Sequence, residues 1–143
     1  MQISIWDDVS EPPNNLKGYI FLWKGNISSN YSDAIPIPQL IEKNDLSLRK
    51  RYLEFVYDFG QIKFFNKSLV EHLEIYQDFS FWWMSLISEK CNWEKSPQIV
   101  NIIRLYLLED WAKKNAFDNL VLYSSNKLLA QCLEKWSVEN KKT

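Results

Sequence analysis

The alternation of apolar and polar positions predicts short strands near both ends of the chain. Residues 2–6 (QISIW) and 18–23 (GYIFLW) are β-branched and aromatic runs bounded by turn residues, and the second predicts a buried strand. Residues 28–38 are polar and include two prolines, which predicts a loop. Residues 120–124 (LVLYS) form another short apolar run. We therefore expect three strands, two early and one late.

Helical spacing dominates the middle of the chain. Apolar residues at helical spacing precede Gly60, a residue that commonly ends a helix; they are Leu48, Tyr52, Phe55 and Val56. Ser68 and Glu71 have the spacing of a capping box, which predicts a helix from Ser68 to about Tyr76. Ser96 and Pro97 mark another helix start. Residues 99–108 are apolar on nearly all sides, which predicts a helix buried between layers.

Residues 79–90 (FSFWWMSLISEK) are the least ordinary stretch. On a helix, one broad arc would hold Trp82, Trp83, Met84, Leu86, Ile87 and Cys91, with Ser85, Ser88 and Glu89 on the other side. This pattern predicts that most of the aromatic side chains are core. Lys90 would project into the apolar arc, either as a lysine whose stem lies along the apolar surface or as a functional cation.

The end of the chain predicts a strand followed by a helix. Ser125 or Asn126 can cap a helix whose apolar stripe is formed by Leu128, Leu129, Cys132, Leu133 and Trp136. The order strand, helices, strand, helix predicts an α/β fold with a parallel sheet. We expect one domain over residues 1–143, with strands in 1–25, a helical region in 45–115 and a strand-helix unit in 119–140.

Composition excludes several classes of function. The 143 residues carry 17 Lys and Arg against 18 Asp and Glu, a net charge of −1, so nucleic acid is not an expected partner. Three glycines argue against a glycine-rich phosphate loop. No apolar run approaches the ~20 residues of a spanning helix, and the first eight residues lack a secretory pattern. These features predict a cytoplasmic protein whose Cys91 and Cys132 are reduced.

Candidate chemistry is sparse. One histidine, His72, and two distant cysteines do not form a metal-ligand cluster, so no metal site is expected. The carboxylate pairs Asp7 with Asp8 and Glu109 with Asp110 could bind a hard cation, although adjacent carboxylates are usually solvated. Residues 124–126 lead from a strand into a helix start, where free amides favour an anion; every such unit begins this way, and a purely structural role is the alternative.

The run from Asp78 to Trp111 (DFSFWWMSLISEKCNWEKSPQIVNIIRLYLLEDW) resembles the N-terminal region of bacterial surface carbohydrate biosynthesis proteins, a group assigned as glycosyltransferases of O-antigen and capsule-like polysaccharides. The matching features are residues 80–84, Glu89 with Lys90, and residues 95–97. The resemblance implies a helix-rich Rossmann-like domain with a small parallel sheet, like the N-terminal half of a GT-B fold. Family members are several times longer than this chain.

The resemblance also implies a function. This domain would supply the acceptor side of a cleft in cell-surface polysaccharide synthesis, with a glycan acceptor and a nucleotide-sugar donor bound through a further C-terminal domain. It implies no cofactor within this chain, assigns no catalytic residue, and leaves catalysis by this chain alone in doubt. Substrate-binding candidates are Lys24 and Asn26, Glu89 and Lys90, and Ser124, Ser125 and Asn126.

Two further expectations concern partners. Lipopolysaccharide synthesis is compatible with a peripheral position at the inner face of the cytoplasmic membrane, and a missing second half would leave apolar surface for a homo-oligomer. The alternative function is a non-catalytic α/β module whose exposed aromatic residues bind a partner chain.

Overall fold

The computed structural model describes residues 1–89 and 96–140. Its contacts divide the chain into two compact units. The first, named the sheet unit, comprises Met1–Lys43 and Arg104–Thr143. The second, named the hairpin unit, comprises Asn44–Ile103. The hairpin unit is therefore inserted, in sequence, between two halves of the sheet unit.

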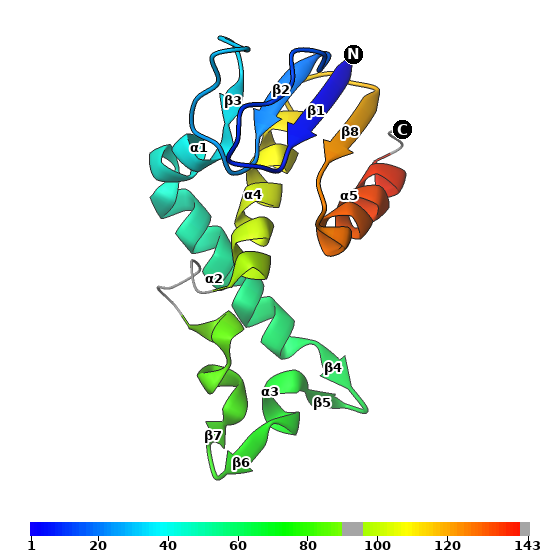
Figure 1. Ribbon diagram of the computed structural model, residues 1–143. Coiled ribbons are helices and arrows are strands. Elements are labelled where there is room, and N and C mark those ends of the chain that lie inside the picture. The colour runs from blue at the N-terminus through cyan, green and yellow to red at the C-terminus, as the bar shows by residue number, and fades with distance from the viewer. Residues whose placement is uncertain (90–95, 141–143) are drawn as a thin grey trace. The chain divides into compact units, whose positions relative to one another are not determined.

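The sheet unit contains a four-stranded parallel sheet in the order β3-β2-β1-β8 (Figure 1). Its strands are β1 (Gln2–Trp6), β2 (Tyr19–Leu22), β3 (Ile35–Pro36) and β8 (Asn119–Tyr123). β1 is central, with β2 parallel on one side and β8 parallel on the other. This arrangement confirms the predicted parallel α/β sheet and the three strands read from the sequence.

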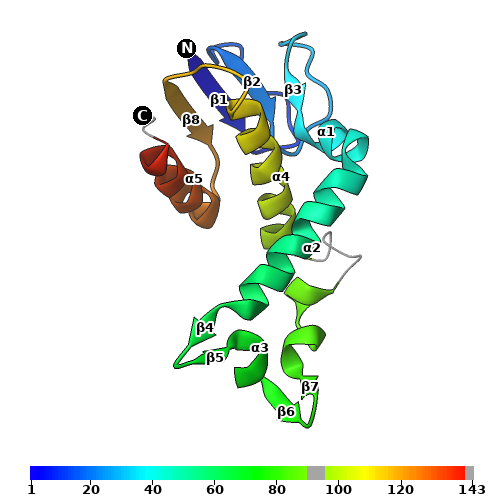
Figure 2. The same ribbon diagram turned by 180° about the vertical axis from the view of Figure 1, so that it is seen from behind.

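One face of the sheet is covered by helices. The ring of Trp111, near the end of α4 (Pro97–Ala112), packs edge-on against Tyr19 and Phe21 of β2, with ring centroids 4.6 and 5.1 Å apart. Helix α5 (Lys127–Glu139) buries Leu129 and Leu133. Figure 2, the view from behind, shows α4 and α5 on the same side of the sheet. The apolar strand residues on this face are buried because α4 and α5 cover them.

The opposite face is covered by loops. Leu16 packs with Ile20 and Leu22 of β2, and Trp6, Tyr31 and Ala34 surround this cluster. The prolines at positions 12 and 13 remove backbone donors from the β1–β2 connection, which contains no helix. That connection returns to the sheet through Gly18 at φ +75°, where an added Cβ would lie 1.9 Å from the backbone oxygen of Gln2. Only glycine fits this approach.

Hydrogen bonds join the two loops on that face. The carboxylate of Glu11 accepts from Ser28 Oγ (2.5 Å) and from the amide of Asn30 (2.9 Å). These bonds lower the pKa of Glu11 below its ordinary value. Tyr31 Oη donates to the carbonyl of Pro13 (2.7 Å) and accepts from the amide of Leu16 (2.8 Å). The loops therefore act as the second layer that helices provide in other α/β sheets.

The hairpin unit begins with α2 (Asp45–Gln61), which buries Leu48, Tyr52 and Val56 of the predicted apolar set and leaves Phe55 partly exposed. Two antiparallel hairpins follow, β4 (Lys63–Phe64) with β5 (Lys67–Ser68), and β6 (Glu74–Tyr76) with β7 (Phe79–Ser80). The short α3 (Leu69–His72) separates them. Tyr52 Oη donates to the carbonyl of Ile87 at 2.7 Å, which fixes α2 to the 3₁₀ turn Leu86–Ser88.

Two boundaries differ from the prediction. The capping box is present, with Ser68 and Glu71 bonded reciprocally, but α3 ends at His72 rather than near Tyr76, because residues 74–76 pair with β7 instead. Residues 28–38 are not wholly a loop. They contain β3 and the start of α1 (Ile37–Lys43), since Ile35 pairs with Phe21 at the sheet edge.

Residues 79–89 are not a helix, which corrects the prediction. They form β7 and two 3₁₀ turns, Phe81–Met84 and Leu86–Ser88. The hydroxyls of Ser85 and Ser88 both donate to the carbonyl of Trp82, at 2.6 and 2.8 Å, and the same carbonyl accepts from the Ser85 amide at 3.0 Å in the pairing of a 3₁₀ turn. Ser88, predicted to lie on the polar side, is buried.

The predicted burial of this segment is correct for Trp82 and wrong for three other residues. Trp82 is 4% exposed and stacks on Phe59 with ring centroids 5.8 Å apart. Trp83, Met84 and Leu86 are about half exposed or more. Lys90 and Cys91 lie outside the described residues. The segment is thus a partly exposed surface anchored by one tryptophan.

The last two helices begin where the sequence predicts. α4 starts at Pro97 and buries Ile99, Ile103 and Leu108. Asn126 caps α5. Leu128 and Cys132, placed in the apolar stripe of α5 by the sequence, are exposed. The apolar stripe of α5 is consequently narrower than its sequence suggests.

Candidate functional site

A buried carboxylate lies at the carboxyl end of the central strand. Asp7 directly follows β1, and its side chain is 3% exposed. Its amide donates to the carbonyl of Tyr123 (3.1 Å), which extends the pairing with β8 past the last strand residue. β1 is also where the order of the sheet reverses, since the chain moves to β2 on one side and later returns to β8 on the other. Ligands of open α/β sheets bind at such points.

Residues following β2 and β8 converge on Asp7. Lys24 Nζ lies 3.0 Å from Oδ1 and donates to the Asp7 carbonyl at 3.3 Å. Ser124 Oγ donates to Oδ2 at 2.5 Å. The Lys24 contact with Oδ1 is short but not aligned as a hydrogen bond, and within the described chain Oδ1 accepts none. Oδ1 is buried, and its nearest charged neighbour is the Lys24 ammonium.

Arg104 of α4 adds a second cation near this carboxylate. Burial lowers the pKa of Arg104, and the negative charge of Asp7 opposes that effect. Arg104 remains charged in any ordinary condition. Lys24, a hydroxyl donor and the more distant charge of Arg104 are thus the polar neighbours of Asp7.

The start of α5 is capped by side chains of the chain itself. Asn126 Oδ1 accepts from the amides of Leu128 and Leu129, both at 3.1 Å, and the amide of Asn126 donates to Ser124 Oγ at 2.9 Å. Three amides that a phosphate would need are therefore already hydrogen-bonded. Asn126 has the structural role that the sequence left open.

A hollow of about 310 Å³ borders the site between β8 and α5. It is lined mainly by apolar side chains, with three polar ones; the lining residues are Leu120, Leu122, Ser124, Ala130, Leu133, Glu134 and Ser137. A volume of this size suits a small ligand, and an apolar wall with a few polar groups is typical of ligand sites. Ser124 belongs both to the hollow and to the Asp7 cluster.

The structure brings together some of the predicted site residues and separates others. Lys24 and Ser124 both contact Asp7. Asn26 is exposed, and its carbonyl accepts from Gln39 Nε2 at 2.9 Å. Ser125 is exposed beside them. Glu89 lies in the hairpin unit, and Lys90 is outside the described residues.

Sequence reasoning missed Asp7 as the centre of this site. The sequence placed it with Asp8 as a solvated pair, but only Asp8 is exposed, where hydrogen bonds from Ser10 lower its pKa. The available signal was position, because a charged residue directly after a strand points to the ligand-binding edge of a parallel sheet.

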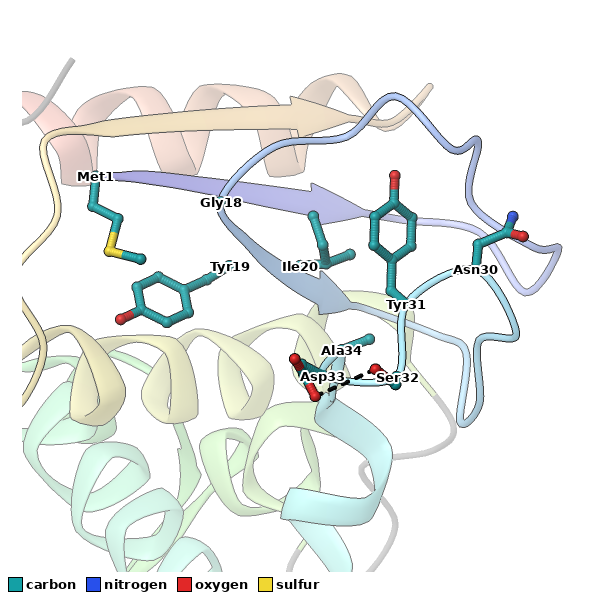
Figure 3. A pocket seen from close by; sticks show the side chains of 9 residues that line it. All are labelled: Met1, Gly18, Tyr19, Ile20, Asn30, Tyr31, Ser32, Asp33 and Ala34. Atoms are coloured by element: carbon teal, nitrogen blue, oxygen red, sulfur yellow. Dashed lines mark hydrogen bonds between the residues drawn. The ribbon is translucent and has the colours of Figure 1, made fainter.

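A larger hollow of about 390 Å³ lies at the open edge of β2, which β3 does not reach (Figure 3). Its polar side chains, Asn30, Ser32 and Asp33, are all exposed and belong to one loop. It contains no buried polar group that would hold a ligand in one orientation. The Asp7 cluster is the better candidate site.

Candidate metal ligands do not cluster among the residues that the structure describes. Within residues 1–89 and 96–140, no group of three or more His, Cys, Asp or Glu side chains could hold a metal ion. Across the same residues, no helix is both long enough and apolar enough to cross a membrane.

The fold and site define a mixed α/β protein with a four-stranded parallel sheet, compatible with a Rossmann-like arrangement, and a buried ionic cluster at its carboxyl edge. Comparison with protein-family models, with curated proteins and with solved structures finds no match to this chain.

Proposed function

We propose that this chain is the acceptor-side domain of a glycosyltransferase in bacterial cell-surface polysaccharide synthesis. The observation that supports this proposal is the buried Asp7 carboxylate, held by Lys24 and Ser124 at the point where the strand order reverses. In nucleotide-binding α/β sheets, free amides at a helix start bind a phosphate at that position. In this chain a carboxylate lies at that position, and three amides at the start of α5 are already hydrogen-bonded. This combination favours a ligand other than a phosphate.

The cluster suits a neutral, hydroxyl-rich molecule such as a sugar. The partly exposed Lys24 ammonium can donate a hydrogen bond to a sugar hydroxyl, and the buried Asp7 carboxylate holds that ammonium in place. Such charge-assisted bonds are stronger than neutral ones. The resemblance of residues 78–111 to surface carbohydrate biosynthesis proteins supports a saccharide rather than another polyol. The activated donor sugar would bind to a further domain.

Ligand-induced thermal stabilisation tests the proposal. We would measure the melting temperature of this chain with a panel of mono- and oligosaccharides and with UDP-, GDP-, dTDP- and CMP-linked sugars. A ligand at about 100 times its Kd stabilises by roughly 2.7 kcal/mol, which is about 8 °C for a chain of this size. We expect a saccharide to give such a shift through this domain.

Asp7→Asn should reduce that shift, because it removes the charge and keeps the shape. Asp8→Asn is the matched control, since it removes the same charge from the exposed neighbouring carboxylate. Equal shifts in the two variants would refute a sugar site at Asp7. The absence of any shift across the panel would favour the non-catalytic interaction module instead.

A further inference from the structure

The turn of the first hairpin has an unusual residue at its tip. β4 and β5 are joined by the two residues Phe65 and Asn66, with Phe64 paired to Lys67. Both turn residues have positive φ, 48° at Phe65 and 67° at Asn66. This is the pattern of a tight turn that normally uses Asn or Gly at both positions. A bulky aromatic residue in the left-handed region is a genuine outlier.

Phe65 makes no evident contribution to the fold. Its side chain is 99% exposed, the highest value among the large apolar residues of the described chain. Asp78, at the turn of the second hairpin, also has positive φ, but Asp and Asn tolerate that backbone. A residue that strains the backbone and buries nothing is better explained by a contact outside the chain.

The neighbours of Phe65 indicate what that contact is. Phe64 is half exposed, and Lys63 and Lys67 are exposed on either side of the two rings. Hydrogen bonds from Ser68 lower the pKa of Glu71, and the charges of Lys63 and Lys67 lower it by smaller amounts. The negative charge of Glu71 therefore offsets part of the positive charge of the two lysines. Lysine is depleted at protein interfaces but is favoured at membrane surfaces, where its stem lies along apolar groups.

We propose that the tip Lys63-Phe64-Phe65-Asn66-Lys67 inserts into the interface of an anionic lipid bilayer. The two phenylalanine rings would enter the boundary between headgroups and acyl chains, while the lysines contact anionic headgroups. The site belongs to the hairpin unit and does not depend on the proposed sugar site. The exposed lysines beside the rings match an anionic bilayer in charge and are depleted at protein interfaces, which favours the bilayer as the partner.

Vesicle co-sedimentation of the full-length chain tests this proposal. The probes are large unilamellar vesicles of phosphatidylcholine alone and of phosphatidylcholine with phosphatidylglycerol at about 30 mol%. We expect binding that is stronger to the anionic vesicles. Phe65→Asn should lower the partition coefficient about tenfold, because one ring no longer enters the apolar boundary. Its melting temperature should be unchanged or higher, since Asn suits the turn.

Two further variants complete the test. Lys63→Gln/Lys67→Gln should reduce binding to anionic vesicles several-fold and leave binding to neutral vesicles unchanged. Leu46→Gln, which replaces an 82% exposed leucine at the other end of α2, should bind like the parent chain. Equal losses for Phe65→Asn and Leu46→Gln would overturn the proposal. So would parent-chain self-association in analytical ultracentrifugation that Phe65→Asn abolishes, because the tip would then be a protein interface.

Discussion

The ion pair between Asp7 and Lys24 can be tested by a double-mutant cycle. The variants are Asp7→Asn, Lys24→Gln and the double variant, compared by the free energy of unfolding in urea at 25 °C. The two charged groups lie 3.0 Å apart, with side chains 3% and 43% exposed. Asp7 is thus desolvated, whereas Lys24 can still be hydrated.

These exposures set the expected magnitude. Breaking a fully buried pair costs about 3–5 kcal/mol, and exposed pairs contribute about 0.2–1 kcal/mol. With one buried and one half-exposed partner, we expect a coupling energy of about 1–2 kcal/mol. Asp7→Asn alone should lower the melting temperature by roughly 6 °C, since about 2 kcal/mol corresponds to that shift in a chain of this size. Ser124 can still donate to the remaining amide oxygen.

The pair Glu109 and Lys113 provides a matched control. It has nearly the same separation, 3.1 Å, but its residues are four positions apart at the end of α4, with Lys113 directly after the helix, and it is more exposed. Its coupling energy should be about 0.3–0.5 kcal/mol. If the Asp7–Lys24 coupling is no larger than this control, the two groups do not form a desolvated pair in solution, and the electrostatic description of the site is wrong.

Three further predictions concern the loops and helix ends. Gly18→Ala should destabilise the fold by more than about 3 kcal/mol in thermal unfolding, because its Cβ would strike a backbone oxygen of β1; Gly25→Ala, whose nearest atom is 3.7 Å away, should cost far less. Glu11→Gln should reduce the loss of stability that occurs as pH falls from 7 to 3. The pKa of Glu11 lies below its ordinary 4.5 in the fold, so its contribution is present above that value and is lost as pH falls through the folded pKa. If Glu11→Gln loses as much stability in acid as the parent chain, the contact between Glu11 and Ser28 is not maintained. Asn126→Ala should cost about 1–2 kcal/mol in urea unfolding, because two amides of α5 lose their acceptor, and a loss below about 0.3 kcal/mol would contradict the capping role.

Elements with strong local signals were predictable from the sequence. Each helix start depends on a few neighbouring residues: the capping box at Ser68, the proline at the start of α4 and the Asn126 cap. The residues that predict each helix start are therefore the ones that form it. The alternating run of β1 likewise identifies a strand without knowledge of its partners. The parallel arrangement followed from the order of these elements.

The FSFWWMSLISEK segment was not predictable by periodicity. Its apolar spacing is compatible with a helix, but the serines at 80, 85 and 88 hydrogen-bond the nearby backbone and favour tight turns. These turns are also held by α2, because Tyr52 donates to the carbonyl of Ile87. Contacts of this kind are not visible in a local window.

The Asp7 cluster depends on residues that are far apart in sequence. Lys24 and Ser124 were named from their positions after strands, but nothing local indicated that they share one carboxylate. Asp7 and Ser124 are separated by 117 positions. Their contact follows only from the pairing of β1 with β8, which the strand order alone did not specify.

The same pairing has a consequence for synthesis of the chain. One edge of β1 is occupied by β2 within the first two dozen residues, whereas the other waits for β8, which begins at Asn119. At roughly 5–20 residues per second, the ribosome needs about 5–20 s to add the intervening residues. Throughout that interval the central strand of the sheet has an unpaired edge, a template for pairing with another nascent chain. The emerging hairpin unit is made during this delay, so the time that β1 stays exposed is set by the length of the insertion.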